Sequence, residues 1–278
     1  MTEFFSILLE EPFLQMAVLA GWLASLGCGL IGPFVVVKRI TFLAGGIAHS
    51  VLAGMGAAVY FDFDPLLGAL LAALASALLM GWIRLYWKAQ EDMLIGALWA
   101  TGMATGLIFI AQKPGYSSDL MSYLFGNILL VPQQDLWFML ALNLLLLLIV
   151  ALFYRQFLAV IFDEEFARLR GVPVNLFYLL LLCLIAVTVV LLIHVVGLIL
   201  VIALLTLPAA IAGHYVRSLG AMMVIATLLG AVFTTGGLAL SYAPDLPAGP
   251  VIILLAAFAY LLSVLGSGLY AKWRAQGR

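Results

Sequence analysis

The sequence predicts an all-α integral membrane protein with about nine membrane-spanning helices, although eight are also possible. Hydrophobic residues make up 66% of the chain and charged residues 9%, whereas soluble domains are roughly 45–50% apolar and 25% charged. The mean hydropathy is +1.24. At about 20 residues per span, 278 residues hold eight or nine helices and leave no room for a sizeable soluble domain. We therefore expect residues 1–278 to form a single transmembrane domain in the cell membrane.

Apolar runs bounded by charge, proline or glycine locate the expected spans. In chain order these are 13–37, 41–60, 65–86, 93–111, 133–153, 174–193, 195–214, 217–241 and 249–270. The stretch between Lys113 and Asp135 is too short and too broken for a full span. We expect a re-entrant or interfacial helix over 122–131, because such segments survive at membrane depth where protein or water covers their backbone.

The distribution of lysine and arginine predicts the orientation, because these residues accumulate on the cytoplasmic side of membrane proteins. With the N-terminus outside and the C-terminus in the cytoplasm, eleven of the twelve basic residues lie inside and Lys113 alone lies outside. The inside set is Lys38, Arg39, Arg84, Lys88, Arg155, Arg168, Arg170, Arg217, Lys272, Arg274 and Arg278. A missed span in mid-chain would scatter this set over both sides.

Several function classes lack support in the sequence. The N-terminal stretch has no lysine or arginine before its apolar run, so it does not read as a cleaved signal peptide. The chain contains no HExxH, GxSxG or Walker A motif, so we expect neither hydrolysis nor ATP binding by this chain alone. No basic stripe points to nucleic acid. Cys28 and Cys183 fall inside apolar spans, where they act as small hydrophobic residues.

The segment 162–174, FDEEFARLRGVPV, places five charges within eight residues of this apolar chain. Acidic residues come first and basic residues follow, which suits the dipole of a short helix. Gly171 supplies the end of that helix, and Phe162, Phe166 and Leu169 recur on one face. A short amphipathic helix over about 162–171, on the basic side of the membrane, predicts a docking element.

His49 lies near the centre of the second span. An ionisable group at that depth indicates a functional site, and imidazole is a common ligand of first-row metals. Four small residues, Gly45, Gly46, Ala53 and Gly56, share its helical face and leave room beside the ring. The alternative is that these glycines allow tight helix packing and His49 only hydrogen-bonds a neighbour.

Two further residues are weaker candidates for a transport pathway. His194 falls where the sixth and seventh expected spans meet outside, and could belong to an access path. Pro208 would break or kink the seventh span, and such helices often line pathways.

Six segments, spread in order over nearly the whole chain, resemble the membrane permease subunits of ATP-binding cassette importers for manganese, zinc and iron. They are PFVVVKRITFLAGGIAHSVLAG, EDMLIGALWATGMATG, SYLFGNILLVPQQDL, FDEEFARLRGVPV, VVGLILVIALLTLPAAIAG and SYAPDLPAGPVIILLAA. The resemblance implies a type II importer fold and two copies of this subunit around a central path. It also implies a cytosolic ATPase partner, an extracytoplasmic metal-binding protein, surrounding membrane lipids and no tightly bound cofactor.

Carried over by position, the resemblance assigns roles to named residues. The coupling helix that docks the ATPase would comprise Asp163, Glu164, Glu165, Phe166, Arg168 and Gly171. His49 would be the pathway histidine. From the residue pattern itself, we expect Gly45, Gly46 and Pro208 to pack along the pathway. Many relatives carry an aspartate four residues before that histidine, where this chain has Gly45.

The expected function is therefore a non-enzymatic permease subunit that moves a divalent metal inward. Zinc is favoured because the carboxylate that would suit manganese is absent, with manganese or iron also possible. The alternative is a stand-alone secondary transporter or channel that uses His49 as an ion or proton site. An intramembrane enzyme is a third, less supported class.

Overall fold

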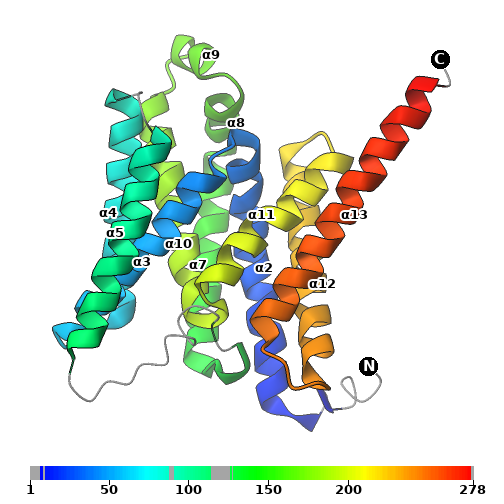
Figure 1. The fold of residues 1–278 in the computed structure, drawn as a ribbon. Coiled ribbons are helices and arrows are strands. Elements are labelled where there is room, and N and C mark those ends of the chain that lie inside the picture. The colour runs from blue at the N-terminus through cyan, green and yellow to red at the C-terminus, as the bar shows by residue number, and fades with distance from the viewer. Residues whose placement is uncertain (1–6, 9, 88–90, 114–125, 127, 277–278) are drawn as a thin grey trace. The chain divides into compact units, whose positions relative to one another are not determined.

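A computed structural model describes residues 7–8, 10–87, 91–113, 126 and 128–276, with the side chains of 91, 194–195 and 268–276 left out. Within this part the chain is all-helical (Figure 1), and nine helices are long and apolar enough to span a membrane. These nine are α2 (Pro12–Lys38), α3 (Thr41–Tyr60), α4 (Pro65–Tyr86), α5 (Glu91–Gln112), α7 (Gln133–Leu152), α10 (Val174–Val196), α11 (Leu198–Tyr215), α12 (Leu219–Tyr242) and α13 (Ala248–Gln276). The prediction of nine spans is confirmed.

Three short helices complete the described elements: η1 (Ile128–Leu130), α8 (Tyr154–Phe162) and α9 (Glu164–Leu169). The re-entrant helix expected over 122–131 lies mostly outside the described residues. The described part of it contains η1 and Gly126, whose φ of +67° is left-handed. The helix α8 was not predicted, because its nine residues follow the fifth span almost without a break.

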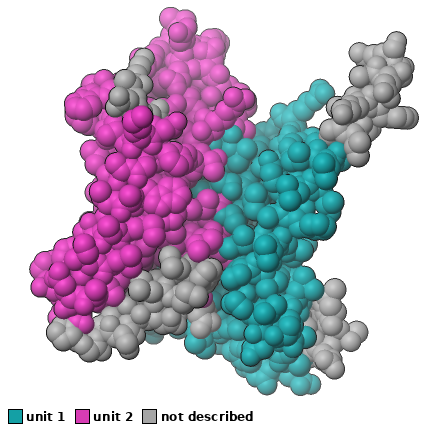
Figure 2. Space-filling view, in the orientation of Figure 1, with its two compact units in different colours: residues 1–36, 127–143, 203–278 teal, residues 37–126, 144–202 magenta. Residues whose placement is uncertain are grey.

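The chain divides into two compact units (Figure 2). Unit 1 holds residues 1–36, 127–143 and 203–278, and unit 2 holds 37–126 and 144–202. The boundaries fall inside α2, α7 and α11, so three helices contribute to both units.

Small residues bring the helices of unit 2 close together. In α3, which packs against α4 and α5, a Cβ at Gly54 would collide with the backbone of Gly68, and one at Gly56 with the backbone of Gly106. Such contacts let helix backbones approach closely in a membrane, where the hydrophobic effect gives helices no reason to associate. α10 packs on α4 and α3 in the same unit.

In unit 1, α2 and α12 meet through small and hydroxyl-bearing residues. A Cβ at Gly29 would collide with Thr227, and one at Gly230 would crowd Ser25. Asn143 of α7 is 1% exposed and donates a hydrogen bond of 3.0 Å to the backbone carbonyl of Leu23. These contacts fasten α2 to its neighbours within the unit.

A tight turn joins α2 to α3. α2 ends at Lys38 and α3 begins at Thr41, which leaves Arg39 and Ile40 between them. Arg39 has a φ of +58°, in the left-handed region that side chains other than glycine rarely adopt. We call this turn, residues 39–40, the elbow.

Candidate functional site: the basic end of unit 2 and the buried His49

The charged segment folds as the short helix α9. The side chain of Asp163 caps its first turn by accepting a hydrogen bond of 2.9 Å from the backbone N–H of Phe166. Its last turn closes with bonds from the N–H of Gly171 to the carbonyl of Arg168 and from Val172 to Ala167. Gly171 adopts a φ of +75°, which suits glycine at a helix end.

The apolar residues of this segment are exposed. Phe162 is 66% exposed, Phe166 48% and Leu169 87%, whereas Ala167 is fully buried against unit 2. The guanidinium of Arg170 lies 4.9 Å from the centre of the Phe166 ring. The helix expected over 162–171 thus breaks at Asp163, whose backbone is extended, and Phe162 instead ends α8. Phe162 together with Phe166 and Leu169 of α9 forms an exposed apolar surface bordered by charge. We call this the outer face of α9.

Lys38, at the end of α2, holds the inner side of α9. Its Nζ lies 2.5 Å from Oε1 of Glu164 and donates a second hydrogen bond of 3.0 Å to the backbone carbonyl of Val160 in α8. The Lys38 side chain is only 10% exposed and that of Glu164 42%. One lysine thus connects the elbow to both short helices.

The Glu164 carboxyl remains ionised at neutral pH. Partial burial raises its pKa, but the hydrogen bond and charge of Lys38, with the charges of Arg84 and Arg168, outweigh that effect. The net result is a pKa below the ordinary value of a glutamic acid. The carboxylate of the ion pair is therefore charged under physiological conditions.

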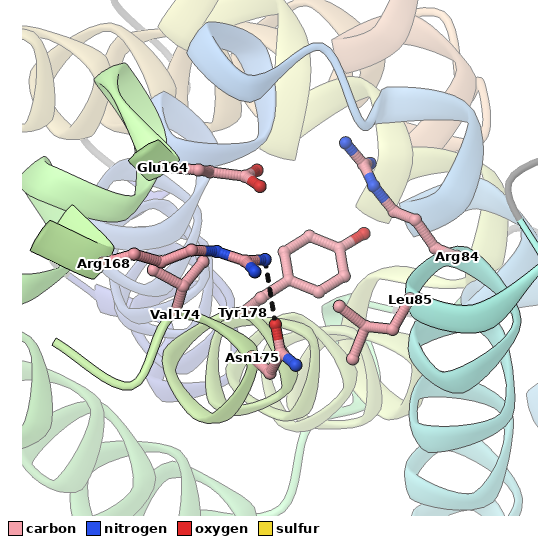
Figure 3. Close-up of a pocket in the computed structure, with 7 residues that line it drawn as sticks. All are labelled: Arg84, Leu85, Glu164, Arg168, Val174, Asn175 and Tyr178. Carbon is pink, nitrogen blue, oxygen red and sulfur yellow. Dashed lines mark hydrogen bonds between the residues drawn. The ribbon is translucent and has the colours of Figure 1, made fainter. Parts of the chain in front are cut away.

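α4, α9 and α10 enclose a cavity of about 440 Å³ beside this ion pair (Figure 3). Its lining comprises Arg84, Leu85, Glu164, Arg168, Val174, Asn175 and Tyr178. Nη2 of Arg168 donates a hydrogen bond of 3.3 Å to Oδ1 of Asn175. The Arg84 guanidinium lies 4.9 Å from the centre of the Tyr178 ring. We call the set Lys38, Arg84 and Arg168 the basic end of unit 2.

His49 lies inside unit 2 and is 8% exposed. Its Nδ1 is 2.9 Å from the carbonyl oxygen of Gly45, and because a carbonyl only accepts, Nδ1 carries the proton. The other ring nitrogen, Nε2, then presents a lone pair, which is the form that binds metals. The imidazole stacks on Trp99 of α5, with ring centres 3.8 Å apart and planes 23° from parallel.

Trp99 also occupies the space beside Gly45. A Cβ at position 45 would lie 3.3 Å from the Trp99 ring and 3.8 Å from Ile202. An aspartate there would need the indole to shift. Gly46 instead faces Ile95 and Met80 in close packing.

The remaining candidates have separate surroundings. α11 continues through Pro208, which is buried, so the proline does not break this span. His194 belongs to the last part of α10, which continues to Val196, and its side chain lies outside the described part. Across the described residues, no three histidine, cysteine, aspartate or glutamate side chains gather into a metal site.

Sequence reasoning missed two contributors, Lys38 and Trp99. Lys38 lies 126 residues before Glu164, and Trp99 belongs to a different helix from His49. Both residues lie in segments that carry the family resemblance, but a single sequence does not show which distant residue each of them contacts. For Lys38, the structure adds that this lysine ends a span and that its side chain is nearly buried.

Comparison with known proteins gives one consistent result. A sequence model described as the ABC 3 transport family matches residues 10–267. An uncharacterized membrane protein of Synechocystis sp. is 49% identical over 256 residues, covering 92% of this chain and 91% of that protein. The manganese transport system membrane protein MntC of Halalkalibacterium halodurans is 33% identical, with 99% and 95% covered.

The solved structure of PsaBC from Streptococcus pneumoniae in complex with Fab matches with a TM-score of 0.86 and 32% identity, covering 94% of each chain. The chain therefore belongs to the ABC 3 transport family, and its recognition as a membrane permease subunit of the ATP-binding cassette importers for metal ions, with the type II importer fold, is confirmed.

Proposed function

We propose that this permease carries a divalent metal ion into the cytoplasm, driven by ATP hydrolysis on a separate cytosolic chain that docks on the outer face of α9. The observation that carries the proposal is the exposure of Phe166 and Leu169 on the capped helix α9, and of Phe162 just before its cap, with charged residues around them. Large apolar side chains gathered on a short exposed helix are typical of a protein interaction site. The coupling residues are Asp163, Glu164, Glu165, Phe166, Arg168 and Gly171.

The Lys38–Glu164 pair offers a path for the coupling. A displacement of α9 acts on Glu164, which is bonded to Lys38 at the end of α2. Beyond the elbow begins α3, the helix that carries His49. ATP-driven movement of α9 would thereby tilt α3 and alternate the access to His49 between the two sides of the membrane.

His49 serves in this proposal as a transient ligand of the cargo. Its Nε2 lone pair can bind a first-row metal, while the hydrogen bond to Gly45 and the stack on Trp99 fix the ring. Within the described residues it does not belong to any group of three or more histidine, cysteine, aspartate or glutamate side chains that could hold a metal ion. A weakly bound ion leaves readily, which suits transport, and two copies of the subunit would bring two imidazoles to one path.

Manganese is the cargo that the similarity to MntC favours, whereas the missing carboxylate at Gly45 favours zinc. An extracytoplasmic binding protein would deliver the metal ion to the permease. The N-terminus of the permease would lie on that same outer side. The choice of metal is tested by growth of a chelator-starved deletion strain that expresses this chain. Rescue by manganese alone would rule out the zinc assignment, and rescue by zinc alone the manganese assignment.

The docking proposal is tested with two exposed residues in unit 2. Leu169→Asp puts a charge on the outer face of α9, and Phe61→Asp is the matched control, 64% exposed at the far end of α3. We expect Leu169→Asp to lose co-purification with the ATPase and to lose metal uptake, while Phe61→Asp keeps both. Uptake that persists without any ATPase would contradict the proposal and favour a stand-alone carrier.

A further inference from the structure

The cavity between α4, α9 and α10 has the chemistry of an anion site. Two guanidinium groups, from Arg84 and Arg168, line it together with the amide of Asn175 and the phenol of Tyr178. Figure 3 shows Arg168 reaching in from α9 while Tyr178 lies between α9 and the helix that carries Arg84. Guanidinium presents five N–H donors in a planar fork that matches phosphate oxygens.

One carboxylate, that of Glu164, also lines the cavity and opposes an anion. Its charge is offset by Lys38, whose Nζ lies 2.5 Å away. Two basic side chains, Arg84 and Arg168, and one acidic side chain, Glu164, therefore line the cavity. The cavity volume of about 440 Å³ is ample for a phosphate group and its ester substituent.

The position of the cavity along α4 indicates where the anion comes from. Arg84 lies in the last turn of α4, and three aromatic residues of the same end are exposed, namely Trp82, Tyr86 and Trp87. Tryptophan and tyrosine gather at the level of lipid headgroups. Basic pockets between helices at that level bind the headgroups of anionic lipids.

We propose that this cavity binds a phosphate-bearing anion, and that its natural occupant is the headgroup of an anionic phospholipid such as phosphatidylglycerol. Because Arg168 belongs to α9 and Arg84 to α4, a phosphate held by both would fasten α9 to the membrane domain. The composition of the membrane would then adjust how firmly α9 is held. This inference goes beyond the proposed transport function, and its binding readout needs neither metal nor ATPase.

The test measures lipid retention by the purified full-length permease. The protein is exchanged into nanodiscs of phosphatidylcholine with a minor share of phosphatidylglycerol, extracted in detergent and examined by native mass spectrometry. Wild type should retain phosphatidylglycerol. Arg84→Gln and Arg168→Gln should each weaken retention roughly tenfold, the effect of losing one charge-assisted hydrogen bond. Arg155→Gln, at an exposed arginine of α8 outside the cavity, should behave as wild type.

Further arms separate the possible occupants. Arg84→Lys should retain lipid to an intermediate degree, which shows that the loss does not come from misfolding. Thermal unfolding with inorganic phosphate identifies a free anion: stabilisation of wild type but not of Arg168→Gln, with no lipid retained, would support the phosphate site and reject the lipid source. Equal retention by wild type and both glutamine variants would overturn the proposal. So would loss of ATPase binding in those variants with no anion bound to wild type.

Discussion

The ion pair between Lys38 and Glu164 is partly buried and joins the end of α2 to α9. An exposed pair contributes little, because water screens it and two long side chains lose freedom. Here Lys38 is 10% exposed and donates a second hydrogen bond to a backbone carbonyl, which also holds its ammonium in place. Glu164 is 42% exposed, which limits the contribution of the pair to stability to the order of 1 kcal/mol.

The pair predicts a stability that depends on pH. The pKa of Glu164 is lowered in the folded protein, so its contribution is complete above the ordinary glutamic acid pKa of about 4.3 and is lost as the pH falls through the lowered value. In thermal unfolding measured from neutral to acidic pH, wild type should lose its advantage over Glu164→Gln in that acidic range. A difference that stayed constant down to the most acidic pH would contradict this assignment.

A double-mutant cycle checks the coupling role of the same pair. Lys38→Gln and Glu164→Gln should each reduce metal uptake without abolishing ATPase co-purification, and the double variant should be no worse than either single variant. The reason is that each change breaks the same connection. Additive losses would show that the two residues act separately.

His49 predicts a loss of transport rather than of stability. His49→Ala removes the Nε2 ligand and should lower metal uptake roughly tenfold or more, since even the loss of an outer partner of a metal ligand costs about 10-fold to 100-fold. His214→Ala is the control, because His214 is an exposed histidine that hydrogen-bonds Ser263 and stacks on Tyr260. Equal uptake by wild type and His49→Ala would remove His49 from the path.

At the scale of elements, α9 depends on its ends. Six residues are too few for a stable isolated helix, so the Asp163 cap and the left-handed Gly171 determine whether the outer face of α9 exists. Burial of Ala167 fixes which side faces unit 2. The apolar residues therefore point outward because the smallest side chain of the helix is the one that fits inward.

Removal of the cap gives a direct test of this dependence. Asp163→Ala should cost about 1 kcal/mol of local helix stability and weaken ATPase binding several-fold, as measured by titration of the purified ATPase. Asp163→Ser keeps a side-chain acceptor and should bind nearly as well as wild type. If serine and alanine behaved alike, the cap would not be what orders the docking surface.

The elements themselves were largely predictable from the sequence, for a clear physical reason. A span must be long and apolar, and its ends must carry the charges and turns that hydrocarbon excludes. The expected span 65–86 coincides with α4, and the expected 217–241 differs from α12 by two residues or fewer. The helix α8 escaped prediction because Phe157, Val160 and Ile161 continue an apolar run, although their spacing fits a buried face.

The candidate site was less predictable, because its contacts join distant parts of the chain. The cluster of charges in an apolar chain pointed to Glu164, and the mid-span position pointed to His49. Neither observation predicted which residue each of them contacts. In the sequence, Lys38 is one of eleven basic residues expected on the cytoplasmic side, and Trp99 is one of many apolar residues in its span. The sequence alone did not explain why position 45 carries glycine instead of aspartate. In the structure, the indole of Trp99 lies beside it.

At the scale of the whole molecule, the basic residues agree with the fold of unit 2. Lys38 meets Glu164, and Arg84 and Arg168 line one cavity. Lys113, the single basic residue expected outside, pairs instead with Asp62, which lies just beyond the far end of α3. This grouping supports an orientation in which the basic end of unit 2 faces the cytoplasm.

The orientation is tested by cysteine labelling at the two ends of α12. In a background with Cys28→Ala and Cys183→Ala, Leu246→Cys and Arg217→Cys introduce exposed thiols beyond opposite ends of this helix. A membrane-impermeant maleimide should label Leu246→Cys in intact cells. It should label Arg217→Cys only after permeabilisation, and the reverse pattern would invert the assigned topology.

The short distance between the elbow and His49 determines how far α3 must rotate to move the imidazole. His49 lies eight residues beyond Thr41, so at 1.5 Å per residue it is about 12 Å along α3 from the elbow. A rotation of about five degrees at the elbow would displace the imidazole by about 1 Å. Metal-to-ligand distances tolerate only about 0.2 Å. In the proposed mechanism the left-handed Arg39 would be the pivot of this movement, and a rotation of a few degrees would suffice to release an ion.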